Sequence, residues 1–378
     1  MENKMIKYLI KQSLSYLKYK SLDELKILIM YDKKDIFSNI LKDFEIPSDN
    51  ITLLDISNFD FLFEENIGND FDLILANPPY KRHEKIKELK EKLKSFKSFN
   101  NTANIDGYIF EKAYQMLGAD GIFGFISLDN YEQTKYAKEF RRFILDSGTI
   151  LDYIKIENEN IMIYQNAYAK ENSVFNYAKI DKIIKDWNDF NTKYTYSYLQ
   201  DDLDEKGFLF LPQKVLKVKK IIEKTQSDNS LYSDKLLLAM RKSKVLKFYK
   251  ESMIYKDIKQ LPIPKISKEA QKPFEILVDY VSFAKENDLS LEASLFESVI
   301  NGLVYDLYFA DEMKKGDCFI SDEVREIVKP WGKSSSEKIK MQFVDLTYKA
   351  FKESRTVERG LIYSRVISVV EVINGVNK

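Results

Sequence analysis

The residues with the clearest chemical potential follow a short apolar segment, residues 71–76, and read Asn77-Pro78-Pro79-Tyr80. An apolar run with a hard stop predicts a buried strand. Two prolines end a strand because they donate no N–H and fix φ, and Pro78 keeps Asn77 out of the helical region. The sequence therefore predicts that Asn77 lies at the C-terminal end of a strand, the edge where open α/β sheets bind ligands.

These residue types fit the transfer of a group to an exocyclic amine. The Asn77 amide oxygen can accept a hydrogen bond from an –NH2 group, and the backbone carbonyls of Asn77 and Pro78 are further candidate acceptors. Two acceptors on one nitrogen draw its hydrogens away and leave its lone pair free to attack a methyl donor. Tyr80 would offer a flat face to a base taken out of its stack. The alternative is an ordinary turn after a core strand.

Composition limits the kinds of protein to consider. With 378 residues, 44% hydrophobic and 31% charged, the chain can form two or three globular domains. Lys and Arg together number 59, as do Asp and Glu, so only local clusters can indicate nucleic-acid binding. A single cysteine and a single histidine exclude an internal disulfide and predict no metal site. No run is apolar enough to span a bilayer and no signal peptide is recognisable, which predicts a cytoplasmic protein without a membrane partner.

Helical and strand patterns alternate along the first 180 residues. Predicted helices cover 2–20, 35–44, 105–117 and 132–145, and predicted strands cover 26–31, 51–54, 71–76, 122–127, 150–156 and a pair within 161–177. This alternation predicts a mostly parallel α/β sheet with helices on both faces. Mixed helical and loop signals follow, and beyond the Pro-Ile-Pro segment at 262–264 the spacing predicts long amphipathic helices.

The order of these features resembles the Eco57I-like, type IIG restriction–modification family of adenine-N6 DNA methyltransferases. The resemblance rests on Asn-Pro-Pro-Tyr, on the helix–turn–strand unit at 105–127 and on C-terminal blocks such as Gly-Leu-Val-Tyr-Asp-Leu-Tyr at 302–308. It implies a Rossmann-like methyltransferase domain at 1–180, a DNA target-recognition module at 181–264 and a helical region at 265–378. It also implies methyl transfer to a flipped-out adenine of double-stranded DNA within a restriction–modification system.

The resemblance implies S-adenosylmethionine as the cofactor. In the family an acidic–aromatic pair contacts the cofactor adenine, and Asp60-Phe61 stands at the matching place, 17 residues before Asn77. Asp32 is the best match for the acid that holds the ribose. The family's glycine-rich turn, which lets backbone approach the cofactor closely, has no counterpart, because the first glycine of this chain is Gly68.

Three explanations for the missing turn are open. In the first, the chain is a truncated or split enzyme that lacks the first strand, and a partner chain supplies the glycine-rich motif. In the second, the chain binds the cofactor in a degenerate way. In the third, the chain is an inactive DNA-binding or specificity subunit. In an alternative threading, residues 26–31 form the first strand and Asp32-Lys-Lys-Asp35 replaces the glycine turn. Methylation of RNA or protein also stays open, since Asn-Pro-Pro-Tyr serves enzymes that act on those substrates.

The residues expected to touch DNA are aromatic or basic. By the resemblance, Tyr164 stacks on the face of the flipped base opposite Tyr80, with Tyr168 as the fallback. Residues 81–97 carry eight Lys or Arg and three Glu, a local charge of +5 that fits either a solvated helix or a phosphate-contacting element. The predicted DNA-binding residues are Lys81, Arg82, Lys217, Lys220, Arg241, Lys242 and Lys244.

Overall fold

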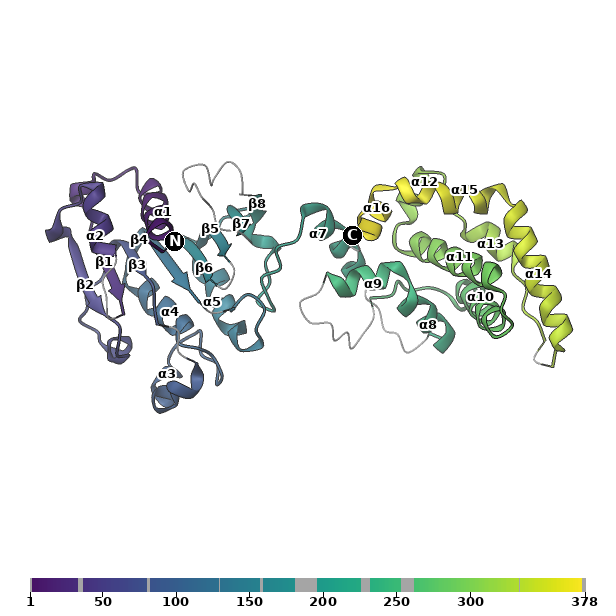
Figure 1. The fold of residues 1–378 in the computed structure, drawn as a ribbon, viewed down its shortest axis with the longest axis horizontal. Coiled ribbons are helices and arrows are strands. Elements are labelled where there is room, and N and C mark those ends of the chain that lie inside the picture. Colours follow the sequence, from purple (N-terminus) through teal and green to yellow (C-terminus); the bar gives the residue numbers. More distant parts are fainter. Residues whose placement is uncertain are drawn as a thin grey trace. The chain divides into compact units, whose positions relative to one another are not determined.

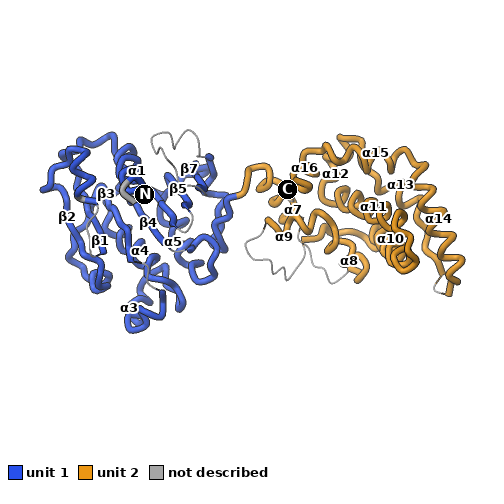
Figure 2. The backbone as a smooth tube through the Cα atoms, in the orientation of Figure 1, with its two compact units in different colours: residues 1–210 blue, residues 211–378 orange. Residues whose placement is uncertain are grey.

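The chain forms two compact units, residues 1–210 and residues 211–378 (Figure 2). The computed structural model describes residues 2–32, 37–79, 82–128, 130–156, 159–180, 196–225, 232–252, 262–332 and 334–375. Packing divides the chain at residue 210, because β8 (Tyr196–Leu199) pairs with β7 (Val174–Ile180) and so extends the first unit past residue 180. The three-part division by function at residues 180 and 264 stays a prediction.

Unit 1 is built on one eight-stranded sheet in the order β2-β1-β3-β4-β6-β5-β7-β8 (Figure 1). Its other strands are β1 (Ile27–Tyr31), β2 (Ile51–Asp55), β3 (Phe71–Ala76), β4 (Leu117–Ser127), β5 (Thr149–Ile156) and β6 (Glu159–Gln165). Strands β2, β1, β3 and β4 are parallel, whereas β6 runs antiparallel to both of its neighbours. The predicted α/β class is confirmed, and the antiparallel β6 and β8 make the sheet mixed.

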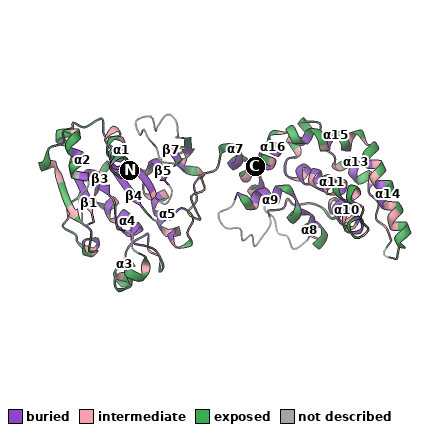
Figure 3. Cartoon of the chain, viewed as in Figure 1, coloured by how far each residue is buried: buried purple, intermediate pink, exposed green. Residues whose placement is uncertain are grey.

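Helices cover both faces of this sheet, and each face has its own core. Figure 3 shows that the central strands are buried. On one face lie α1 (Glu2–Ser15) and α2 (Phe37–Leu41), and on the other lie α4 (Asp106–Met116) and α5 (Lys138–Ser147). Successive side chains of a strand point to opposite faces, so β3 gives Leu73 and Leu75 to the first core and Ile74 and Ala76 to the second. Strand β3 is therefore held from both sides up to its last residue.

Unit 2 consists of helices in the part of the chain that the structure describes. They are α7 (Gln213–Lys224), α8 (Asp234–Lys242), α9 (Lys244–Glu251), α10 (Lys268–Glu286), α11 (Ser290–Tyr308), α12 (Ala310–Lys315), α13 (Ser321–Ile327), α14 (Glu337–Glu353), α15 (Arg355–Tyr363) and α16 (Ser368–Gly375). Serine side chains that accept a backbone N–H begin five of them, α8, α9, α10, α14 and α15. One continuous apolar core joins these helices, in agreement with the predicted helical C-terminal region.

A buried carboxylate ties α11 to the start of α13. Asp306 is 3% exposed. Its Oδ2 accepts from the backbone N–H of Ile320 at 2.9 Å, and from the N–H and hydroxyl of Ser321 at 2.8 and 2.7 Å. Burial dominates over these bonds and raises the pKa of Asp306 to about 6. Asp306 therefore makes the stability of unit 2 depend on pH.

Because the folded pKa of Asp306 is raised, the folded chain keeps a proton that the unfolded chain has already released. Between about pH 4 and pH 6 this group therefore lowers the free energy of unfolding as the pH rises, by up to about 3 kcal/mol. Asp306→Asn, which keeps an acceptor oxygen without the charge, is expected to remove that loss. Urea unfolding followed by circular dichroism from pH 4 to 7 measures it. The exposed Asp311→Asn is the control, and parallel profiles for wild type and Asp306→Asn contradict the assignment.

Candidate active site

The carboxyl ends of β2, β1 and β3 form one edge of the sheet. Tyr31, the last residue of β1, is the register partner of Asp55, the last residue of β2. The N–H of Ile56 continues this contact by donating to the Tyr31 carbonyl at 2.9 Å. Strand β3 has its predicted bounds and ends at Ala76, so Asn77 lies at the same edge.

The Asn-Pro-Pro turn begins where the strand ladder stops. Ala76 is paired with Met30 of β1 and with Phe125 of β4, and these are the last pairs that β3 makes on either side. Asn77 is half-buried and Pro78 is buried. In the described part of the chain, the carbonyls of Asn77 and Pro78 thus lie outside the ladder, as the prolines predict. Tyr80 and Lys81 lie outside the described residues.

The strand order bears on the two possible threadings. In the doubly wound fold the first strand lies between the second and the fourth strands. Here β1 lies between β2 and β3, which is the place of the first strand if β3 corresponds to the fourth. This agrees with the threading in which residues 26–31 are the first strand, with Asp32 starting the turn that replaces the glycine-rich one. Residues 33–36 lie outside the described residues. In this threading β2 is the second strand. The acidic residue at its C-terminal end, where the family's ribose-binding acid would lie, is then Asp55, 23 residues after Asp32.

Asp55 was missed by the sequence reasoning. The feature that could have identified Asp55 is its position directly after the apolar run 51–54, which marks the end of a strand. The carboxylate is exposed, and its Oδ1 accepts from the N–H of Ser57 at 2.8 Å. The Ser57 hydroxyl and N–H lower the pKa of Asp55, so this carboxylate is a charged acceptor at neutral pH.

The two residues of the predicted pair Asp60-Phe61 differ in their exposure in the structure. Both residues lie in a short 3-10 turn, Asp60–Phe63, which follows β2. Asp60 is exposed, but Phe61 is 2% exposed and packs in the core on the α4 side of the sheet. The expected contact of the Phe61 ring with the cofactor adenine is therefore wrong for this arrangement, because the core already covers that ring. Asp60 stays a candidate.

The predicted base-stacking role of Tyr164 is wrong. Tyr164 pairs with Phe123 near the start of β4, since β6 runs antiparallel, whereas Asn77 follows the residue paired with Phe125. The Tyr164 ring is fully buried and its hydroxyl donates to the Ile144 carbonyl. The fallback Tyr168 lies beyond the same end of β6, toward the edge away from Asn77. Strand direction, which the residue pattern alone does not give, decides both.

The residues that end β4 lie beside Asn77 instead. Ser127 stands two positions after Phe125, the partner of Ala76. Its hydroxyl donates to the carboxylate of Asp106, which starts α4, and both residues are 1% exposed. The sequence reasoning selected neither, because Ser127 ends an apolar strand and Asp106 reads as a helix start. A buried polar pair thus supports the strand tip.

The loop after β4 is fixed by a buried arginine. Arg141 of α5 is fully buried, and its guanidinium donates to main-chain carbonyls on two segments, 131–134 and 205–206. Three of the distances are 2.8 Å to Glu205, 2.9 Å to Thr134 and 3.0 Å to Lys206. Arginine suits this place because its planar group carries five donors. Arg141 thereby joins the loop beside Asn77 to the end of unit 1.

A buried glutamate fixes the same loop from the sheet. Glu132 is 3% exposed and forms an ion pair with Lys155 of β5. The hydroxyl of Tyr153, also on β5, donates to the second carboxylate oxygen at 2.9 Å. The N–H of Phe208 donates to the Glu132 carbonyl at 2.8 Å. These bonds hold the loop in one place relative to the sheet.

The predicted basic residues occur in both units. The segment after Arg82 forms short turns at His83–Lys85 and Lys87–Leu89 and one helical turn, α3 (Lys90–Leu93), in place of a long helix. The described members of the predicted DNA-binding set are all exposed, namely Arg82, Lys217, Lys220, Arg241, Lys242 and Lys244. In the described ranges, no cluster of three His, Cys, Asp or Glu residues could hold a metal ion. Likewise, no described helix has the length and apolar character needed to cross a membrane.

A doubly wound sheet with an Asn-Pro-Pro turn at the tip of a central parallel strand defines the class, a Rossmann-like methyltransferase domain. The comparison with protein families gives the particular group. Residues 3–162 match the Eco57I restriction-modification methylase family.

Several known proteins are similar to parts of the chain. The type II methyltransferase M.BstVI of Geobacillus stearothermophilus is 29% identical over 79 residues, which is 20% of this chain and 14% of that protein. The methyltransferase subunit of a type I restriction-modification system from Streptococcus thermophilus is 12% identical, with a TM-score of 0.36 over 52% of this chain and 54% of its own. The type IIG restriction endonuclease BpuSI is 10% identical, with a TM-score of 0.43 over 67% of this chain and 39% of its own. The matches thus span only part of each relative.

Proposed function

We propose that the protein is a DNA methyltransferase of a restriction–modification system that transfers a methyl group from S-adenosylmethionine to N6 of adenine in double-stranded DNA. One observation carries the proposal: Asn77-Pro78-Pro79 turns away from the strand ladder at the tip of β3, within residues that match the restriction-modification methylase family. Adenine N6 is an exocyclic amine of the kind that two acceptors at this tip would bind.

The chain's own residues position the target base. The base leaves the duplex at a cost of a few kcal/mol, and the Asn77 amide oxygen and the Pro78 carbonyl accept the two hydrogens of its N6. The lone pair then points away from the protein acceptors toward the donor, so orientation supplies the rate and no covalent intermediate is needed. As N6 bonds to the methyl carbon, the carbon–sulfur bond of the donor breaks, and N6 releases one of its two hydrogens as a proton to water. Tyr80 stacks on one face of the base. With Tyr164 excluded, we assign the second face to Leu128, an apolar side chain 46% exposed directly after β4.

The strand tips fit the adenosine part of the cofactor. Asp55 and Asp60 are exposed carboxylates on the same side of the sheet as Asn77, and carboxylates accept from ribose hydroxyls and from the adenine amino group. When bound, S-adenosylmethionine supplies the electrophilic methyl group. Asp32 starts the turn after β1, where the family has glycine.

The isolated chain is expected to bind S-adenosylmethionine, and Asp55→Ala is expected to weaken binding at least about tenfold, because one hydrogen bond to a charged group is lost. Asp60→Ala tests the second carboxylate in the same way. Calorimetry measures both. Asp49→Ala is the matched control, since Asp49 is exposed at the other end of β2. Equal affinities for Asp55→Ala and Asp49→Ala contradict the assigned ribose contact.

Transfer of tritiated methyl groups to duplex DNA tests the reaction. RNA of the same sequence and bulk protein are the comparison substrates. Incorporation into DNA with methyl groups on adenine N6 supports the proposal, and incorporation only into RNA or protein overturns the assigned substrate.

A second candidate is a catalytically inactive DNA-binding or specificity subunit that needs a partner chain. The turn after β1 lacks glycine, which favours this candidate, as does the edge strand β2, whose Leu53 is 51% exposed and could pair with a partner's strand. DNA binding by the isolated chain without cofactor binding or methyl transfer would establish it, and the partner would then carry the glycine-rich motif.

A further inference from the structure

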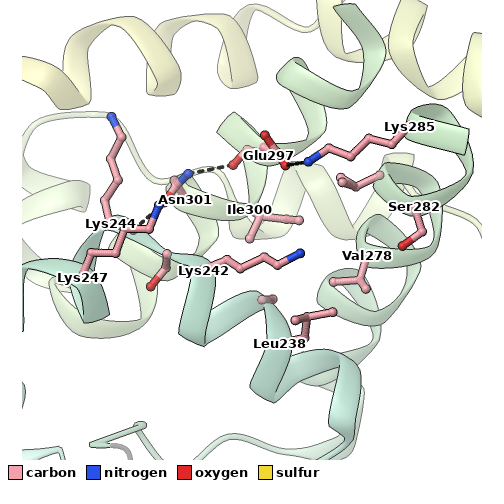
Figure 4. Close-up of a pocket in the computed structure, with 13 residues that line it drawn as sticks. Leu238, Lys242, Lys244, Lys247, Val278, Ser282, Lys285, Glu297, Ile300 and Asn301 are labelled. Carbon is pink, nitrogen blue, oxygen red and sulfur yellow. Dashed lines mark hydrogen bonds and ion pairs between the residues drawn. The ribbon is translucent and has the colours of Figure 1, made fainter. Parts of the chain in front are cut away.

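Unit 2 contains a groove whose rim is rich in lysine. It has a volume of about 440 Å³ and lies among α8, α9, α10 and α11. Figure 4 shows Lys242 extending into the middle of the groove, with the Lys285–Glu297 pair on one side and Lys244 and Lys247 on the other. These four lysines against one glutamate give the lining a charge of +3, although the whole chain is neutral.

The lysines converge because the chain bends at Ser243. This residue is 1% exposed and has extended backbone, so it ends α8 and begins α9. Its hydroxyl oxygen accepts from the N–H of Leu246 and donates to the Met240 carbonyl. As a result, the same groove is lined by Lys242, the last residue of α8, and by Lys247, the fourth residue of α9.

Most of the positive charge of the groove lysines is not paired with a carboxylate of the described residues. Lys285 pairs with Glu297 at 2.6 Å, whereas the ammonium of Lys244 donates to the uncharged side chain of Asn374 at 3.1 Å. No ion pair joins Lys242 or Lys247 to a carboxylate of the described residues. The floor is apolar and is formed by Leu238, Ala239, Val278, Val281 and Ile300.

We propose that this groove holds the sugar–phosphate backbone of DNA and anchors unit 2 to the substrate. The groove joins Lys247 and Lys285 to the two predicted lysines Lys242 and Lys244. A phosphodiester strand matches the lining because its phosphates suit the ammonium rim and its deoxyribose faces suit the aliphatic floor. The floor has no aromatic side chain, so the groove grips backbone and does not stack bases. An acidic protein segment is the competing occupant, and the assignment to DNA rests on the proposed function.

Binding of the full chain to a fluorescent 30-base-pair duplex tests this site. Each phosphate contact contributes about 0.9 to the slope of log affinity against log salt. Lys242→Gln/Lys247→Gln is therefore expected to weaken binding roughly 50-fold at 0.1 M salt and to reduce the slope by about 2. The control is Lys338→Gln/Lys352→Gln, which removes the same charge from exposed positions of α14, and it is expected to bind within about twofold of wild type.

The outcomes separate this site from the proposed reaction. Equal losses for the two double variants, or no loss for Lys242→Gln/Lys247→Gln, overturn the groove as a DNA site even if methyl transfer persists. If that variant keeps its DNA affinity but no longer binds polyglutamate, which wild type binds, the groove takes an acidic protein segment instead. A chain that binds DNA through the groove but transfers no methyl group contradicts only the proposed reaction. Circular dichroism confirms that the variants are folded.

Discussion

Asn77→Ala is expected to slow methyl transfer to DNA by about 10²–10³-fold, the usual cost of removing one well-placed polar group from a reaction site. The side chain is half-buried at the tip of β3, outside the strand ladder, and the following prolines fix its backbone. Without the amide oxygen, one hydrogen of the target amine has no acceptor and the lone pair is no longer oriented.

Single-turnover transfer of a tritiated methyl group measures this effect. Asn66→Ala is the matched control, because Asn66 is an exposed asparagine in the loop before β3. Calorimetry with the cofactor and anisotropy with duplex DNA show whether Asn77→Ala still binds both partners, as expected for a group that acts on the reacting amine. Wild-type transfer by Asn77→Ala would exclude the assigned role, and full loss of cofactor affinity would make Asn77 a structural residue.

Arg141→Met is expected to lower the free energy of unfolding of unit 1 by about 3 kcal/mol or more. The guanidinium is fully buried and donates to carbonyls at 131, 134, 205 and 206. A methionine of similar length fills the space but leaves these buried acceptors without a donor. The loop after β4 and the end of unit 1 should then separate.

The neighbouring Arg142→Met is the control. Its side chain is 44% exposed and pairs with Glu139 and Glu205, so its loss should change the free energy of unfolding by less than about 1 kcal/mol. Hydrogen exchange of peptides from β5 and β6 reports on unit 1 separately from unit 2. Similar exchange rates for the two variants would contradict the structural role given to Arg141.

Some of the site could be predicted from residue types because local rules decide it. The apolar run before two prolines gave the bounds of β3 and the place of Asn77, since proline ends a ladder whatever surrounds it. The edge of the sheet followed from the alternation of helices and strands. The predictions for Phe61 and Tyr164 failed for reasons that are not local. The burial of Phe61 depends on which side of its turn packs against the core, and the position of Tyr164 depends on the direction of β6.

By itself the sequence determined the α/β class, the tip that carries Asn77 and the absence of a glycine-rich turn, because these depend on backbone geometry within a few residues. Only the tertiary structure placed β1 directly beside β3, brought Asp55 to the site edge, turned Tyr164 away and gathered four lysines from three helices into one groove. The physical reason is that strand pairing and helix packing join residues far apart in the chain through cooperative burial of apolar surface, which no local pattern encodes.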